Sequence, residues 1–566
     1  MLRDDTQSLV GLLMAFAVLW ASGCCAVPSQ TGAAEDTSGS SDEEPDAGQD
    51  TSSGTDTGPV SASFVTPPED LLPDWSMSWL EVAGDHGSEV VNEIAASGSD
   101  RFVASGWADQ SEYLVFGSIS VPVWPENMFL VEYTIDGKVL WAAWAGEGPC
   151  VAPLDLDALQ DGRIAVAGVC GQDACFGPGE PNETWLHTGP STAYSTSYLA
   201  VYEPGGKLAW ARDLSLEGSI SRAEGYAVDI LESGEVLSAG SFEGEVTAAK
   251  GTSSETVLST VEDYTIGEEN VFLLEYDSAG ELIWARSEGG PGQTIANGMA
   301  ALEDGSFFLV GAFNGTTVFG EGTEAETTLV SEDVASVFLA RFTAEGQLSW
   351  VVDLGVDGSL GNFDSGKVGE PLLADNGDVL VPGRFRGTMP AGDGEEVTPV
   401  DAGDGWGLFL ARYTADGSRV WNRVSVSDDA PGISLGGFYG VAELADGTLV
   451  AAGMMKGEMA FGPGEVDELT IETLGTCDGV IAAYSPSGDF LWALPQGDHG
   501  SDYYSDVESF VGEEGQDVLI AGGGFSEQTT FGTGGDDVVT VTATEPSGDS
   551  WWPYDLFLQR FDREAP

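Results

Sequence analysis

The stretch FLARYTADGSRVW at residues 409–421 decides the fold of this 566-residue chain. Its alternating apolar and polar residues predict two β-strands, and the TADG between them predicts a tight turn in which Gly417 takes a positive φ. The motif Tyr/Phe-x3-Gly-x3-Trp that it contains occurs six times without a change of spacing. The copies begin at Tyr133, Tyr202, Tyr276, Phe342, Tyr413 and Tyr484. The chain is therefore expected to repeat a β-hairpin.

A second hairpin precedes each copy, as in ALEDGSFFLVG and ELADGTLVAAG. Five of these upstream hairpins keep two glycines in the spacing Gly-x5-Gly. Two hairpins in series form a four-stranded antiparallel unit of about 70 residues, whose strands we name A to D. Repetition of such a unit is the construction of a β-propeller blade.

The two ends of the repeat region carry complementary half-motifs. MSWLEVAG at 77–84 reads as a D strand with no C strand before it, and FLQRFD at 557–562 reads as a C strand with no D strand after it. Pairing them would complete a seventh blade and remove two exposed sheet edges. We therefore expect an all-β, seven-bladed β-propeller of four-stranded antiparallel blades, closed by the N-terminal strand D pairing with the C-terminal strand C.

These repeats resemble the bacterial β-propeller repeat (SBBP-like) family from Trp75 to the end of the chain. There is a weaker similarity to pyrroloquinoline-quinone-type propeller repeats, whose docking tryptophans pack between blades. The resemblance implies a structural role for the repeated tryptophans. They are Trp79, Trp141, Trp210, Trp284, Trp350, Trp421 and Trp492.

The first 23 residues read as a lipoprotein signal peptide: Arg3 precedes an apolar run too short to span a bilayer. The ASG-C junction resembles the bacterial lipobox, which makes Cys24 the lipid attachment site, although Ala21 stands where Leu is usual. An ordinary secretory signal is the alternative. Residues 24–74 form an acidic Ser/Thr/Gly stretch, expected to be a disordered tether, and residues 75–566 form the propeller. The expected location is the bacterial cell envelope, as an outer-membrane lipoprotein facing the periplasm or the surface.

The formal net charge of −75 excludes two classes of partner. Nucleic acid and anionic lipid surfaces would be repelled, so contact with a membrane is expected through the lipid anchor only. A saline habitat, calcium sites and a basic partner each explain the charge, and the scattered distribution of the acids favours the first.

The long D–A links and B–C loops share one face, which makes that face the candidate binding surface. Two of the links repeat GDHG, with Asp85 and His86 in one and Asp498 and His499 in the other. A transition metal is one interpretation, but repeat duplication explains the match as well, and no metal is assigned.

Aromatic residues provide the second candidate on this face. The segment SWWPYD holds Trp551, Trp552 and Tyr554, and the corresponding region of the first blade holds three more, Trp107, Tyr113 and Trp124. Exposed aromatic rings commonly stack on sugars or on apolar patches of a partner. Folding down to cap the blade is the competing interpretation.

Several acidic segments have the oxygen-ligand composition that calcium prefers, without the EF-hand spacing. They include Asp155, Asp157, Asp161, Asp357 and Asp364. We expect these segments to be solvated turns, so no cofactor is assigned and calcium stays an alternative.

The cysteines allow one short disulfide. Cys170 and Cys175 flank a predicted bend and could be bridged in an oxidising envelope. Cys150 is another partner for either, and Cys477 has no evident mate.

No familiar catalytic motif occurs, and only three histidines could act as general bases. The sequence therefore predicts a monomeric, lipid-anchored binding or scaffold module for a protein or glycan rather than an enzyme. Two alternatives stay open: an envelope-assembly scaffold lipoprotein, and a carboxylate-dependent glycan hydrolase.

Overall fold

The computed structural model describes residues 75–563, except 85–87, 110–112, 123–125, 146–150, 172, 188–194, 261–268, 356–367, 375, 404, 428–435, 499, 534–537 and 544–553. Every regular element in this part of the chain is a β-strand, so the fold is all-β as expected. Among the same residues, no helix is long and apolar enough to cross a membrane. The signal peptide, Cys24 and the tether lie outside the described residues.

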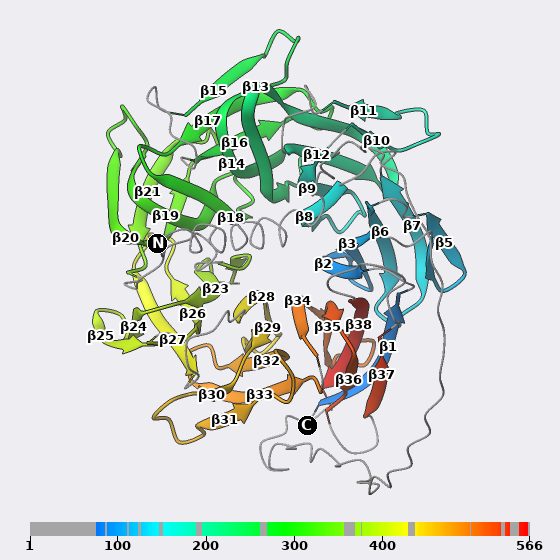
Figure 1. The fold of residues 1–566 in the computed structure, drawn as a ribbon, viewed down its shortest axis with the longest axis vertical. Coiled ribbons are helices and arrows are strands. Elements are labelled where there is room, and N and C mark those ends of the chain that lie inside the picture. Colours follow the sequence, from blue (N-terminus) through cyan, green and yellow to red (C-terminus); the bar gives the residue numbers. More distant parts are fainter. Residues whose placement is uncertain are drawn as a thin grey trace, which may run out of the picture.

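Sets of four antiparallel strands recur along the chain. The first sets are β2 (Ser88–Gly98), β3 (Arg101–Asp109), β6 (Glu126–Thr134), β7 (Val139–Ala145); β8 (Val151–Ala158), β9 (Ile164–Cys170), β12 (Thr196–Glu203), β13 (Lys207–Ile230); and β13 again with β14 (Val236–Ala248), β16 (Asn270–Tyr276), β17 (Leu282–Glu288). They are followed by β18 (Gln293–Ala301), β19 (Phe307–Phe319), β20 (Thr327–Phe342), β21 (Leu348–Asp353); β22 (Leu372–Leu373), β23 (Val379–Phe385), β26 (Gly407–Tyr413), β27 (Arg419–Ser427); and β28 (Gly437–Glu443), β29 (Leu449–Met455), β32 (Asp478–Tyr484), β33 (Phe490–Gln496). Figure 1 shows these sheets side by side around a common centre, with first strands such as β2, β8, β18 and β28 innermost.

The remaining set joins the two ends of the repeat region. β34 (Asp502–Val511), β35 (Asp517–Phe525), β38 (Asp555–Arg563) and β1 (Trp75–Ala83) form one sheet in that order. β1 is antiparallel to β38, from Trp75 opposite Arg563 to Ala83 opposite Leu556. The expected pairing of the N-terminal D strand with the C-terminal C strand is therefore present.

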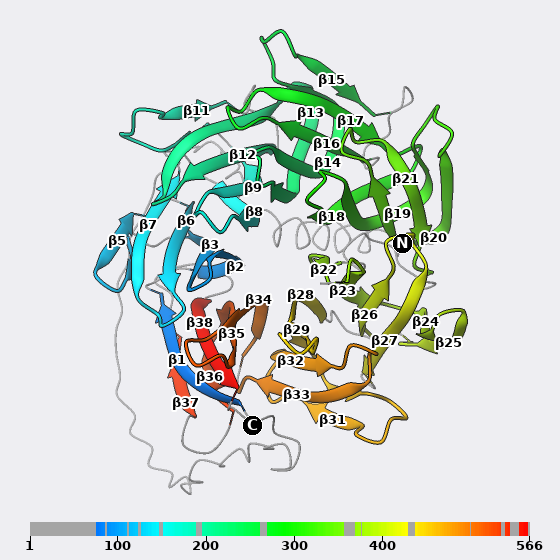
Figure 2. The ribbon, with the colours of Figure 1, turned by 180° about the vertical axis from the view of Figure 1, so that it is seen from behind.

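Short hairpins follow the second strand of most sets. They are β4 (Tyr113–Phe116) with β5 (Ile119–Pro122), β10 (Ala174–Phe176) with β11 (Thr184–Leu186), β24 (Thr388–Asp393) with β25 (Glu396–Asp401), β30 (Glu458–Phe461) with β31 (Leu469–Glu472), and β36 (Gln528–Phe531) with β37 (Val539–Thr542). In the same place, β15 (Thr256–Ser259) pairs with the end of β14. Figure 2 shows several of them, including β11, β15 and β25, at the outer rim of the ring.

The apolar core lies between neighbouring sheets. One cluster joins Ala104 and Val131 of the β2 sheet to Ile520 and Leu558 of the β34 sheet, all fully buried. Similar clusters join the other neighbouring sheets. Because burial of apolar surface is the main stabilising contribution, each sheet depends on its neighbours.

The repeated tryptophans lie where one sheet meets the next. Five donate their indole N–H to a backbone carbonyl in the C–D turn of the following sheet. These pairs are Trp79 to Ile135, Trp210 to Ser278, Trp284 to Ala344, Trp350 to Ala415 and Trp421 to Pro486. Trp141 instead donates to the Glu132 carboxylate in its own sheet, and Trp492 packs on Trp75 with ring centroids 6.3 Å apart.

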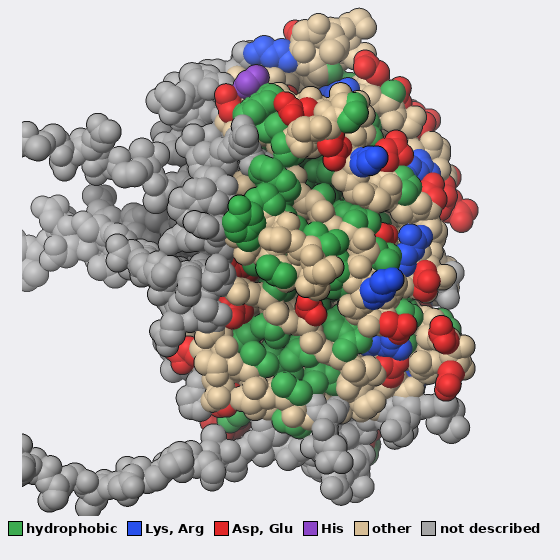
Figure 3. Space-filling view, turned by 90° about the vertical axis from the view of Figure 1, so that its right-hand side faces the viewer, with side chains coloured by type: hydrophobic (Ala, Val, Ile, Leu, Met, Phe, Trp, Pro, Cys, Tyr) green, Lys and Arg blue, Asp and Glu red, His purple; other side chains and the backbone are tan. Residues whose placement is uncertain are grey.

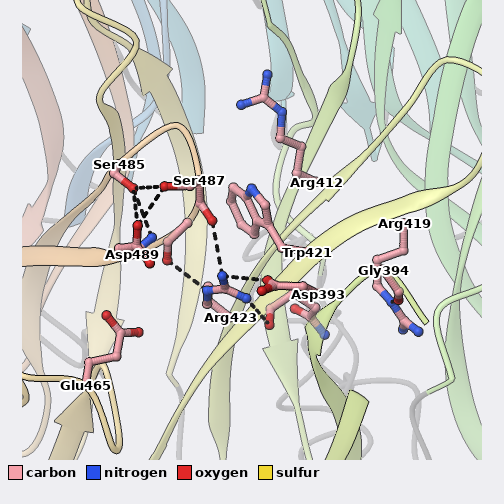
Figure 4. Close-up of polar contacts among 12 residues, drawn as sticks. Asp393, Gly394, Arg412, Arg419, Trp421, Arg423, Glu465, Ser485, Ser487 and Asp489 are labelled. Atoms are coloured by element: carbon pink, nitrogen blue, oxygen red, sulfur yellow. Dashed lines mark hydrogen bonds and ion pairs between the residues drawn. The ribbon is translucent and has the colours of Figure 1, made fainter. Parts of the chain in front are cut away.

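The turn glycine of the motif meets two requirements, as the surroundings of Trp421 show; Figure 4 draws Trp421 and Arg423 near Ser487 of the next turn. Gly488 of the next turn has φ +84°, and a Cβ there would lie 2.8 Å from the Trp421 ring. Arg423 lies 5.5 Å over the same ring and donates to the Gly488 carbonyl at 2.9 Å. Glycine thus provides both the left-handed turn and the space for the indole.

Charged side chains are not evenly spread over the outer wall. Figure 3 shows Lys and Arg gathered toward one edge of the side in view, with Asp and Glu among them. Several arginines, such as Arg212, Arg286 and Arg423, bond carbonyls of the next C–D turn. The scarce basic residues are therefore partly used in joining sheets.

Candidate functional site

The inner strands share a local irregularity at the same place in their pairing with the second strand. A β-bulge interrupts the pairing of the first and second strands after Val91, Pro153, Gly225, Ala296, Phe438 and Tyr504. The residue that resumes the pairing is acidic in three of these strands: Glu93, Asp155 and Asp506. Glu370, two residues after the Val368–Gly383 bridge, occupies the same place in the β22 sheet. We call these four residues the axial carboxylates.

The axial carboxylates converge although they come from different sheets. Oxygens of Glu93, Asp155 and Glu370 lie within 4.8 Å of one another. Asp506 approaches this group, and its charge together with that of Glu370 raises the pKa of Glu93 after the larger effect of burial. Asp155 and Asp506 are only 3% and 5% exposed. This is a concentration of negative charge largely shielded from water.

Backbone N–H groups of the following sheet hold two of these carboxylates in place. The Val228 N–H donates to Asp155 at 2.6 Å, and the Ile94 N–H donates to Asp506 at 3.1 Å. Burial still raises the pKa of Asp155 to about 7 and that of Asp506 to about 6. The pKa of Glu370 is raised well above its usual value by burial and then by Asp155 and Asp506. Desolvation and mutual repulsion therefore outweigh the hydrogen bonds.

A second tier lies two residues further along three inner strands. Its members are Asp157, Asp229 and Glu508. Asp157 and Asp229 accept N–H bonds from Ile230 and Ala301 of the next sheet, at 2.8 and 2.9 Å. Burial raises the pKa of Asp157 to about 6 and that of Glu508 to about 8. Acidic side chains thus occupy two successive levels of the inner strands.

An aromatic cluster occupies the end of the sheets where the inner strands begin. Its members are Trp107, Arg384, Trp406, Tyr439, Tyr503 and Tyr554. Val90 and Met454 are buried beneath Trp107, Tyr439 and Tyr554, which are only half-buried. Tyr503 meets Tyr554 edge to face, with ring centroids 5.7 Å apart. The cluster combines partly buried aromatic rings with an apolar base.

Arg384 places a positive charge inside the aromatic cluster. Its guanidinium lies 4.7 Å from the centre of the Trp406 ring, and its side chain is 4% exposed. It also hydrogen-bonds the Tyr439 hydroxyl, whose pKa is raised mainly by burial.

The aromatic cluster adjoins the axial carboxylates through β28. The Glu370 N–H donates to the Tyr439 carbonyl at 3.1 Å. A Cβ on Gly440 would lie 2.1 Å from the Asp506 carboxylate, so glycine leaves the space that this acid occupies. The two groups therefore form one continuous site.

Another buried acid, Asp502, lies at the start of β34. It is 1% exposed and accepts a hydrogen bond from the Thr529 hydroxyl at 2.5 Å. Burial raises its pKa to about 8. Asp502 is thus a buried acid close to Tyr554, whose pKa its charge helps to raise.

The residues proposed from the sequence are only partly described. Tyr554 lies in the aromatic cluster, and Asp498 follows β33. Asp85, His86, His499, Trp551 and Trp552 lie outside the described residues, so the paired GDHG hypothesis stays a prediction. Trp107 belongs to strand β3 rather than to a loop, Tyr113 in β4 is 54% exposed, and Trp124 lies outside the described residues.

The expectation for the acidic segments was wrong at Asp155 and Asp157. Both lie in β8 on the inner strand rather than in a solvated turn, because the apolar residues that alternate with them pack between sheets. Asp161 is exposed in the following turn, and Asp357 and Asp364 lie outside the described residues.

The cysteine prediction stays open. Cys170 ends β9 and Cys175 lies in β10, and both are buried. Cys477 packs in the apolar base of the aromatic cluster. Cys150 lies outside the described residues.

Comparison with known proteins shows no family. No family model matches the chain. A 152-residue stretch is 28% identical to the regulatory protein FlaEY of Caulobacter vibrioides, covering 27% of this chain and 15% of that protein. The similarity to SBBP-like repeats is therefore still an expectation.

Two solved structures are similar over most of their length at 9% identity. One is a polysaccharide lyase, an ulvan lyase, with 82% of this chain and 96% of that chain covered and a TM-score of 0.35. The other is a GH43 protein from Bacillus licheniformis, with 86% and 98% covered and a TM-score of 0.26. These neighbours contradict the expectation that the chain is not an enzyme, and that expectation is withdrawn. The likeness itself assigns no activity to this chain.

Proposed function

We propose that this chain is an exported, lipid-anchored, seven-bladed β-propeller whose aromatic cluster binds a glycan. The recurring four-strand sets and the pairing of β1 with β38 support the closed ring and its count of blades. The apolar run before Cys24 and the acidic stretch at 24–74 support export, anchoring and a tether to the outer membrane. Replacing Cys24 with Ser should abolish incorporation of labelled palmitate; unchanged labelling would contradict the anchor.

The observation that carries the glycan proposal is the aromatic cluster. Sugar rings bind by stacking their apolar faces on aromatic side chains, and half-buried Trp107, Tyr439 and Tyr554 offer such faces above a rigid base. Rings with few torsions lose little conformational entropy when a ligand orders them.

The electrostatics of the protein favour an uncharged glycan. A net charge of −75 works against polyanionic chains. Arg384 is buried and already engaged with Trp406 and Tyr439, so its role is to orient the aromatic rings rather than to attract a charged sugar.

The test is binding of the full chain to a glycan array, followed by calorimetry with the best ligand. Tyr439→Ala and Trp107→Ala should each weaken binding at least tenfold. Trp185→Ala is the matched control, because Trp185 lies on β11 and is 41% exposed. No glycan bound, or equal loss with the control, would refute the proposal.

The same samples should be assayed for cleavage. Reducing ends report hydrolysis, and absorbance of an unsaturated product reports elimination. Either signal, lost in the Asp502→Asn variant, would add a catalytic step to the binding site.

A further inference from the structure

The axial carboxylates gather several acidic groups in one place, and a side-chain hydrogen bond between Glu93 and Asp506 balances only part of them. Glu93, Asp155 and Glu370 bring oxygens within 4.8 Å of one another in a largely buried place. Like charges at this distance and burial both oppose ionisation, and an unpaired buried charge is costly. Either protons or a cation must therefore balance this group near neutral pH.

A separate observation points to a missing ligand at the same place. Ser105 is fully buried, and its hydroxyl oxygen has no hydrogen-bond partner among the described residues. Ser105 lies directly opposite Glu93 in the β2–β3 pairing, and paired residues project from the same face of a sheet. Buried hydroxyls are normally satisfied, so an oxygen aimed beside Glu93 without a partner indicates an absent ligand.

A second neutral oxygen has the same property. The side-chain oxygen of Asn297 is buried without a partner among the described residues. Asn297 immediately precedes Gly298, which contacts the Glu370 backbone. Asn297 thus lies in the chain beside the residue that packs on Glu370.

We propose that the axial carboxylates bind one calcium ion, with Glu93, Asp155 and Glu370 as charged ligands, the Ser105 hydroxyl as a neutral ligand and Asp506 as a neighbouring charge. The donor set is oxygen only, which suits a hard divalent cation. Oxygens on opposite sides of calcium are about 4.6–5.2 Å apart, whereas magnesium requires about 4.0–4.2 Å. The oxygens of Glu93, Asp155 and Glu370 lie within 4.8 Å of one another, and such an oxygen-only set suits calcium, which accepts six to eight ligands in flexible geometry, better than magnesium, which demands near-ideal octahedral geometry.

The ion would act as a cross-link at the centre of the ring. Its ligands come from β2, β8 and the segment before β22, which are far apart in sequence. Binding to the folded state alone stabilises that state by mass action. It would also fix β2 and the backbone that carries Tyr439, since Glu370 bonds that carbonyl.

The experiment uses the full chain, freed of metal with EDTA, in 0.15 M NaCl with 5 mM MgCl2 at pH 7.5. This background suppresses weak binding to exposed acids. Calorimetric titration with CaCl2 should show one site, and calcium should raise the melting temperature.

Two isosteric variants and one control make the test specific. Asp155→Asn and Glu93→Gln should each reduce calcium affinity at least tenfold while near-native circular dichroism is kept. Asp161→Asn removes an exposed acid six residues from Asp155 and should bind calcium like the wild type.

Three results would overturn the proposal: no saturable calcium heat, equal affinity in Asp155→Asn and Asp161→Asn, or equal affinity for magnesium. If either variant fails to fold, the other and the wild-type titration still decide. The outcome is independent of the glycan assay, because the cation needs no glycan to bind.

Discussion

Replacing Trp421 tests whether the repeated tryptophans hold adjacent sheets together. Trp421 is 2% exposed and donates to the Pro486 carbonyl of the next turn at 3.3 Å. Truncating a buried Trp to Ala costs about 3–5 kcal/mol, and we expect about 4. Trp421→Phe keeps most of the apolar contact and loses the hydrogen bond, so about 1–2 kcal/mol is expected.

The expected change in melting temperature follows from the size of the folded region. Unfolding entropy of about 2.1 cal/mol/K per residue gives about 1 kcal/mol/K for roughly 490 residues. Trp421→Ala should therefore lower the melting temperature by about 4 °C, and Trp421→Phe by about 1–2 °C, in scanning calorimetry. Trp185→Ala, on the exposed β11, should change the free energy of unfolding by less than about 0.5 kcal/mol.

A double-mutant cycle makes the test decisive. Gly488→Ala forces a side chain into a left-handed φ of +84° and against the Trp421 ring. The φ strain, about 1–2 kcal/mol, persists without the indole, but the clash does not. The cost of Gly488→Ala should fall by about 1 kcal/mol in the Trp421→Ala background. Additivity within about 0.3 kcal/mol would refute the proposed docking.

The remaining predictions concern pH, closure and the thiols. Folding raises the pKa of Asp155 from an ordinary 3.8 to about 7. Between these two pH values the folded state binds more protons than the unfolded state, so the stability of the calcium-free protein should fall as pH rises from about 4 to 7. Calcium should accordingly raise the melting temperature more at pH 8 than at pH 5, and equal increases at the two pH values would contradict this prediction. Ser76 lies opposite Asp562 in the β1–β38 pair, so the Ser76→Cys/Asp562→Cys variant should form a disulfide, which mass spectrometry detects as a loss of 2 Da. The cross-link should raise the free energy of unfolding by at most about 6 kcal/mol. Failure to form it would argue against a closed ring. Alkylation of the unfolded, non-reduced protein tests the disulfide. Cys170 and Cys175 should stay unlabelled if they are bridged, and labelling of both would exclude the bridge.

The repeat could be predicted because the turn glycine of the motif satisfies two local structural requirements. Gly417 and its equivalents must take a positive φ at the end of a three-residue loop, and they also lie against the tryptophan of the preceding sheet. Both requirements fix the same spacing, so the motif stays regular although the sheets differ in length. The pairing of the two ends could be predicted for the same reason, because a D strand that carries Trp79 needs a C strand beside it.

Of the axial carboxylates only Asp155 was singled out from the sequence, and its convergence with the other three acids was missed because that signal is not local. Glu93, Asp155 and Glu370 each lie 13 residues before a glycine of the second strand, at Gly106, Gly168 and Gly383. Each acid alone looks like part of a polar segment in a very acidic chain, and alternation with apolar residues does not reveal which face points toward the centre. The convergence of these carboxylates depends on the β-bulges and on the arrangement of the sheets in a ring. A repeat alignment that marked the acids by position would have grouped them.

The tryptophan motif stabilises the fold, whereas the axial carboxylates determine what the fold can bind. Trp–Gly contacts join six of the described sheets to the next one and involve no ligand, so they recur wherever the complete motif occurs. The equivalent of Glu93 is Ala227, Gly298 or Gly440 in other inner strands, and small residues there leave space for the acids of neighbouring sheets. If the acids served only to solubilise the protein, they would have no reason to occupy buried positions where desolvation opposes their charge. Their cost is offset only when a cation or a shared proton occupies the centre, which is why calcium binding by the wild type, compared with Asp155→Asn, decides the role of this site.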